Sequence, residues 1–190
     1  MKRCKILLFT LLLITIVSCG DDDGGGITEE QRQLVMGDDS SENIVSLGLT
    51  SPLVLSLDQV HITPRALDIN FDQTTDITLN AYQEFSGDRG LTLNTESADV
   101  RVSVDENGDI KALNSGDIVT ATSETWVNAS TLPLAEIAGQ TVSGLWNGLQ
   151  NKFVAVRIDI GTTRYFGWVE LSVDNYDNYS LHNYVVKLIP

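Results

Sequence analysis

Cysteine is nearly absent from this chain of 190 residues, in which the two cysteines are Cys4 and Cys19. Because none follows residue 19, the folded part has no disulfide bond, no thiol nucleophile and no cysteine-ligated metal. Such a domain depends on its hydrophobic core. About 145 residues is enough for one, since a domain of that size buries roughly 68–70% of the surface of its unfolded chain.

Positive charge is also scarce. Nine of the 12 Lys and Arg residues and all 26 Asp and Glu residues follow residue 18, which gives that part a formal charge of −17. Nucleic-acid binding requires clustered Lys and Arg, so we expect no nucleic-acid partner. For the same reason we expect no docking on anionic lipid through a basic patch.

Histidine is limited to His61 and His182. A catalytic triad needs a histidine beside a nucleophile and an orienting acid, and the chain has no G-x-S-x-G motif. Two histidines also make a poor zinc site. We interpret His61 as a loop residue and His182 as part of a terminal strand, and we predict no catalytic residue.

Residues 1–18 have the pattern of an export signal. Lys2, Arg3 and Lys5 precede the mostly apolar run Ile6–Val17. The run is too short for a membrane-spanning helix, which needs about 20 apolar residues. Ser18-Cys19 resembles the lipobox that lipoprotein signal peptidase cuts. The resemblance implies that Cys19 becomes a lipidated N-terminus, held in the membrane by acyl chains that each gain about 0.8 kcal/mol per buried CH₂.

The residues after Cys19 suggest where the protein is localised. The run Asp21, Asp22 and Asp23 resembles the surface-export signal of Bacteroidota lipoproteins, and Gly20 is not the Asp that retains lipoproteins in the inner membrane. This implies the outer membrane, with the protein facing the cell exterior. We expect residues 19–45 to be a flexible acidic and glycine-rich tether, with a short helix over Ile27–Met36 and a reach of about 28 Å.

Residues 46–190 carry alternating apolar patterns typical of strands. Val100, Val102 and Val104 alternate with polar residues before an Asn107-Gly108 turn, a strong hairpin signal. The same alternation recurs over 154–160, 165–173 and 179–188. Only Leu132–Ala138 suggests a helical turn. We predict one all-β domain, an antiparallel β-sandwich or jelly-roll-like fold with one or two short helical turns.

Residues 68–76 resemble a calcium loop. The oxygen-bearing side chains of Asp68, Asn70, Asp72 and Asp76 occupy positions 1, 3, 5 and 9, and Thr74 would supply a backbone carbonyl. The sixth position holds glutamine where the pattern expects glycine, and the twelfth lacks the Glu of an EF-hand. Two interpretations of the loop stay open: it binds a structural Ca²⁺, or it is a polar connection between two strands.

Aromatic residues offer a possible ligand surface. Trp126, Trp146, Phe166 and Trp168 could form a platform for stacking sugars. On the strand Arg164–Val173, Phe166 and Trp168 share one face. Buried packing is the more common fate of such rings, so we favour a core role over a binding role.

The C-terminal half resembles a recurrent block of exported proteins. The segments 152–158, 166–173 and 181–184 are similar to a "K-[YF]-[IV]-G-V-[RK]-F … Y-G-W-[IV]-x-[LV]-S-V" pattern found in Bacteroidota surface lipoproteins and PEP-CTERM sorted proteins. Ala112–Ile118 and Asp68–Thr78 resemble further parts of these proteins. The resemblance implies a β-fold and export, and it does not imply any particular catalytic reaction.

These observations favour a membrane-anchored, surface-exposed lipoprotein acting as a non-catalytic binding or envelope module for a glycan or protein. Two alternatives stay open. A secreted carbohydrate-active hydrolase would need two carboxylates about 5–9.5 Å apart in a cleft. A calcium-stabilised structural domain would lose stability when a chelator is added.

Overall fold

The chain folds almost entirely into antiparallel β-strands. The structure is a computed structural model, and it describes residues 32–41, 43–56, 61–176 and 178–189. Its strands form three sheets, one each of five, six and two strands. They are β1 (Gln33–Val35), β2 (Ile44–Ser56), β3 (His61–Leu67), β4 (Ile77–Gln83), β5 (Arg89–Thr95), β6 (Val100–Val104), β7 (Ile118–Thr120), β8 (Thr125–Val127), β9 (Leu132–Ala138), β10 (Thr141–Ser143), β11 (Lys152–Ile160), β12 (Thr163–Asn175) and β13 (Asn178–Ile189).

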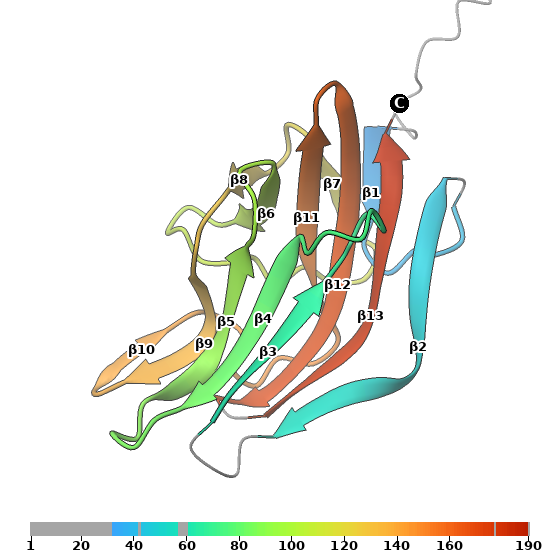
Figure 1. Ribbon diagram of the computed structural model, residues 1–190. Helices are drawn as coiled ribbons and strands as arrows, with labels where there is room; N and C mark the ends of the chain where they lie inside the picture. Colours follow the sequence, from blue (N-terminus) through green and yellow to red (C-terminus); the bar gives the residue numbers. More distant parts are fainter. Residues whose placement is uncertain (1–31, 42, 57–60, 177, 190) are drawn as a thin grey trace, which may run out of the picture.

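The two large sheets pack face to face (Figure 1). One has the order β10-β9-β5-β4-β3 and the other the order β2-β13-β12-β11-β6-β8. The long hairpin β11–β12 turns at Gly161, whose φ of +61° suits a residue without a Cβ. This arrangement confirms the prediction of an all-β antiparallel sandwich.

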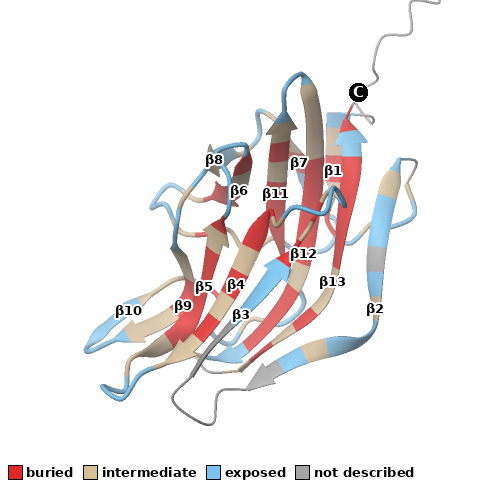
Figure 2. Ribbon diagram, viewed as in Figure 1, coloured by how far each residue is buried: buried red, intermediate tan, exposed pale blue. Residues whose placement is uncertain are grey.

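The main core fills the space between these sheets. On β11, Val154, Val156 and Ile158 point inward and are at most 2% exposed. Leu79 and Leu93 of the five-stranded sheet are fully buried in the same cluster. Figure 2 shows this burial along β4, β5 and β11 to β13. Each such side chain contributes about 1.5–3 kcal/mol, so this layer supplies most of the driving force for folding.

A second core lies on the opposite face of the six-stranded sheet. There β1 pairs with β7, and Leu34 and Val119 pack with Phe166 and Trp168 of β12. The ring of Phe153 meets that of Trp168 edge to face, with ring centroids 5.1 Å apart. Strand β12 is therefore buried on both faces. Among the described residues, no strand layer covers the outer face of the five-stranded sheet.

The folded domain begins earlier than the boundary near residue 45 that the sequence suggested. Gln33–Val35 form a strand where the end of a helix was expected, and Met36 is only 1% exposed. The reason is tertiary packing, because Leu34 and Met36 gain burial beside large aromatic rings. Residues 1–31, which include the signal and the first part of the expected tether, lie outside the described residues.

Two internal segments also differ from the sequence prediction. Leu132–Ala138 is a strand that pairs with β5 and β10, and its buried Leu134 and Ala135 belong to the main core. Packing thus outweighs the local helical tendency. After the Asn107-Gly108 turn, Ile110 makes only a single bridge to Val104 in place of a full hairpin strand.

Candidate functional site

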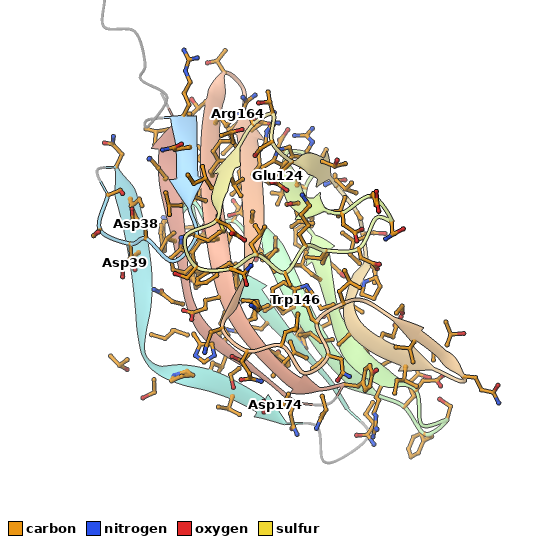
Figure 3. All side chains as sticks on the ribbon, turned by 180° about the vertical axis from the view of Figure 1, so that it is seen from behind. Asp38, Asp39, Glu124, Trp146, Arg164 and Asp174 are labelled. Atoms are coloured by element: carbon orange, nitrogen blue, oxygen red, sulfur yellow. The ribbon has the colours of Figure 1, made fainter. Side chains whose placement is uncertain are left out.

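The predicted lipidation and export residues, Cys19, Asp21, Asp22 and Asp23, lie outside the described residues. The N-terminal strand β1 contacts β13, because the carbonyl oxygen of Gln33 accepts a hydrogen bond from Lys187 Nζ at 3.0 Å. In Figure 3, β1 begins at the end of the molecule that carries Arg164. The chain coming from Cys19 therefore enters the domain at that end.

The described residues contain no helix with both the length and the apolar character to cross a bilayer.

The candidate calcium loop joins β3 to β4, and its carboxylates bind its own backbone. Asp68 accepts hydrogen bonds from the N–H groups of Asp72 at 3.1 Å and Gln73 at 2.7 Å. Asp72 accepts the N–H of Thr74 at 2.8 Å and the side-chain amide of Asn70 at 3.1 Å. These bonds, that from Thr74 foremost, lower the pKa of Asp72. The acidic side chains thus shape the turn.

Asp76, at the end of the loop, is buried with 4% exposure. Its Oδ2 atom accepts the backbone N–H groups of Ile69 at 2.7 Å and Asn70 at 3.1 Å. Burial raises the pKa of Asp76 to about 6, although both hydrogen bonds favour the charged form. Asp76 is therefore the acceptor that ties the start of the loop to its end.

Gln73 adopts a φ of +71°, so the residue that departs from the calcium pattern still makes the turn that glycine favours. Within the part of the chain that the structure describes, no three His, Cys, Asp or Glu side chains gather in a metal-binding arrangement. The loop is closed by hydrogen bonds of the chain itself.

The aromatic residues singled out as a sugar platform do not share an open surface. Trp146 is 0% exposed in the main core, while Phe166 at 0% and Trp168 at 2% belong to the second core. Trp126 is half-buried and stacks on Phe166, with ring centroids 5.5 Å apart. Three of the four rings are enclosed and have no ring face available to a ligand.

The two histidines lie on strands. His61 begins β3, where a loop was expected, and His182 lies on β13 as expected. His182 Nε2 is 2.8 Å from Ser172 Oγ, which also accepts the N–H of Asn151 at 2.9 Å. Ser172 is 4% exposed, and no described carboxylate hydrogen-bonds to His182. This pair links β12 and β13 to the start of β11 and lacks the third member of a triad.

The uncovered outer face of the five-stranded sheet carries a polar cluster that the sequence did not reveal. Tyr82 of β4 reaches over Gly90 of β5 and donates a hydrogen bond to Glu136 of β9 at 2.5 Å. Ser143 of β10 donates to the other oxygen of Glu136 at 2.8 Å. Burial and the hydrogen bond to Glu136 raise the pKa of Tyr82, so its hydroxyl stays protonated as a donor.

Gly90 allows β5 and β9 to approach each other closely beside this contact. A Cβ at that position would lie 2.7 Å from the carbonyl oxygen of Ala135 and 2.9 Å from Glu136 Cα. Because Tyr82 and Glu136 are 54 residues apart in the chain, only the strand register brings them together.

A second cluster surrounds Asp159 near the end of β11. Its carboxylate contacts Arg101 at 2.7 Å, Arg157 at 2.8 Å and Arg164 at 2.8 Å. Burial acts to raise the pKa of Asp159, but the hydrogen bonds and charges of Arg157 and Arg164 outweigh it and hold the pKa below its usual range. Three guanidinium groups share one carboxylate. The pairing of the strands thus brings arginines together, although the chain as a whole has few basic residues.

Comparison of the chain with models of protein families, with curated protein sequences and with solved structures finds no match.

Proposed function

We propose that this protein is a lipid-anchored lipoprotein of the outer membrane, displayed on the cell surface, whose β-sandwich is a non-catalytic binding module. The lipobox-like Ser18-Cys19 supports the anchor, and the run Asp21–Asp23 supports surface display. The signal and the absence of cysteine after residue 19 suit an exported domain that is stabilised by its core alone.

The observation that carries the binding role is the difference between the outer faces of the two large sheets. The six-stranded sheet is covered by β1 and β7 over a second core. The five-stranded sheet presents Thr78, Asn80 and Tyr82 of β4 on its uncovered side, next to Glu136 and Ser143. This face therefore combines hydroxyl, amide and carboxylate groups with one aromatic ring.

This chemistry fits a glycan. Sugars present many hydroxyl groups that exchange hydrogen bonds with amide and carboxylate side chains, and their C–H faces pack on aromatic rings. Glu136 already holds Tyr82 and Ser143 in place, so part of the face is organised before a ligand arrives. A sheet surface suits an extended polysaccharide better than a small molecule enclosed in a cavity.

We expect the intact protein to be retained on at least one cell-surface or plant-type polysaccharide, and Tyr82→Ala to weaken that binding about five- to tenfold. The reason is the loss of one aromatic contact worth about 1 kcal/mol. Affinity electrophoresis against a polysaccharide panel measures the effect. Phe85→Ala is the matched control, because Phe85 is 96% exposed on the β4–β5 turn and reports nonspecific adsorption by an aromatic ring.

Binding that is lost in Phe85→Ala but retained in Tyr82→Ala would contradict a site on the sheet face. Absence of retention across the whole glycan panel would count against a glycan as the ligand.

A further inference from the structure

The end of the six-stranded sheet at which the N-terminal segment enters projects beyond the rest of the domain. Figure 1 shows the β11–β12 turn and the end of β13 extending past the acidic loop between β3 and β4. Arg32 is 13 residues after Cys19, and a chain of that length spans at most about 45 Å. A lipid on Cys19 would therefore hold Arg32, and with it this end of the domain, within about 45 Å of the bilayer.

Basic side chains concentrate at this end. Of the six arginines after residue 18, Arg32 precedes β1, while Arg101, Arg157 and Arg164 surround Asp159. Three arginines on one carboxylate leave a local surplus of positive charge. Asp99 precedes β6 and contributes a further carboxylate on the neighbouring strand end.

The opposite end is acidic. Glu84 and Asp88 lie at the β4–β5 turn, and Figure 3 shows Asp174 at the end of the molecule opposite Arg164. The arginine cluster around Asp159 is therefore a local concentration of positive charge on a domain whose total charge is strongly negative. A negatively charged surface would attract this cluster more than the acidic parts of the domain, such as the region of Asp174.

Apolar side chains project from the same strand ends. Ile160, at the end of β11, and Leu188, near the end of β13, are each 43% exposed. Tyr165 lies opposite Leu188 in the β12–β13 ladder and is half-buried. These three side chains lie on the main-core face of the sheet, and Arg157 and Arg164 lie on the opposite face of the same strand ends. Tyrosine, aliphatic and arginine side chains at one end of a domain are the combination found where proteins meet a membrane interface.

We propose that this strand end docks on the bilayer that holds Cys19, with Ile160 and Leu188 entering the headgroup region and Arg101 and Arg164, the more exposed arginines of the cluster, facing lipid phosphates. The proposal rests on the lipid anchor of the proposed function. The contact by itself is weak, since each basic residue near an anionic surface is worth about 1 kcal/mol. Tethering by Cys19 makes it effective, because it raises the local concentration of the bilayer surface.

Docking also sets the orientation of the binding face relative to the membrane. With the ends of β11 to β13 on the membrane, the strands stand away from it, and the five-stranded sheet is exposed along its length. The polar cluster of Tyr82, Glu136 and Ser143 is then held away from the lipid surface, where a large glycan can reach it.

The test uses the full acylated protein in vesicles of phosphatidylethanolamine and phosphatidylglycerol, with an environment-sensitive fluorophore on an introduced cysteine. Ile160→Cys and Leu188→Cys place the probe at the proposed contact. Val142→Cys is the matched control, since Val142 is 59% exposed on β10, away from this end. The folded part has no native cysteine to compete for the label.

We expect the probes at positions 160 and 188 to brighten at least twofold with a blue shift, and the probe at position 142 to stay unchanged. Adding Arg164→Glu, or replacing phosphatidylglycerol by phosphatidylcholine, should reduce the signal at position 160. If the protein floats with the vesicles but all three probes report water, docking is wrong and the anchor stands. If the protein does not float, the anchor fails and the docking proposal fails with it.

Discussion

Trp146→Ala is expected to lower the free energy of unfolding by about 3–5 kcal/mol, the range for removing a large buried aromatic ring. Trp146 is fully buried in the main core, and its indole N–H donates a hydrogen bond to the carbonyl oxygen of Ile110 at 3.0 Å. The substitution removes both the packing and this donor, so urea unfolding should shift to a much lower midpoint.

A pair of conservative variants separates the hydrogen bond from the packing. Trp146→Phe and Trp168→Phe remove the same atoms from two buried sites, but the indole N–H of Trp168 has no hydrogen-bond partner among the described residues. We expect Trp146→Phe to cost about 1 kcal/mol more than Trp168→Phe. Equal losses, or a larger loss for Trp168→Phe, would contradict the described arrangement of the two cores.

Asp76→Ala is the second substitution with a large expected effect, a loss of about 2–4 kcal/mol. It leaves the N–H groups of Ile69 and Asn70 without their acceptor, at a position where Ile69 is fully buried. Asp76→Asn is the matched control because it keeps a carbonyl oxygen in place and removes the buried charge. It should be at least as stable as the wild type at pH 7.

The difference in stability between the wild type and Asp76→Asn should depend on pH, and the raised pKa of Asp76 fixes the direction of that dependence. Asp76 titrates near pH 6 in the folded protein and near 4 when unfolded, so the folded state binds more protons between these values. The stability of the wild type relative to Asp76→Asn should therefore fall as the pH rises from about 4 to 6. A relative stability that rises over this range would contradict the burial of Asp76.

Calcium binding can be tested by thermal unfolding of the wild type and Asp76→Asn. If the hydrogen bonds described for Asp68, Asp72 and Asp76 account for the loop, neither chelator nor added Ca²⁺ should change the melting temperature. A rise with Ca²⁺ in the wild type that is lost in Asp76→Asn would show that the loop is a metal site.

The strands that the sequence predicts best are those with long alternation. Residues 154–160 and 165–173 repeat apolar side chains at every second position, and both segments lie in strands of the six-stranded sheet. The three-residue strands β1, β7, β8 and β10 are too short to show a period. Their positions follow from packing on Phe166 and Trp168 or from pairing with a neighbouring strand, neither of which a local pattern contains.

The polar clusters around Asp159 and Glu136 could not be predicted from the sequence for a similar reason. Arg101 and Asp159 are 58 residues apart, and they meet because β6 pairs with β11 in one register. Tyr82 and Glu136 meet because β4 and β9 pair with the two sides of β5 in this register, with Gly90 between them. The aromatic side chains drew attention as a possible site, but three of the four are buried, since large rings gain most from leaving water.

The most direct test of the lipoprotein proposal is mass spectrometry of the N-terminal peptide of the protein purified from cell membranes. We predict a chain that begins at Cys19 and carries a diacylglyceryl group on its sulfur, and we predict that Cys19→Ala releases the protein from the membrane fraction. A membrane-associated protein that begins elsewhere, or whose Cys19 carries no lipid, would contradict the account.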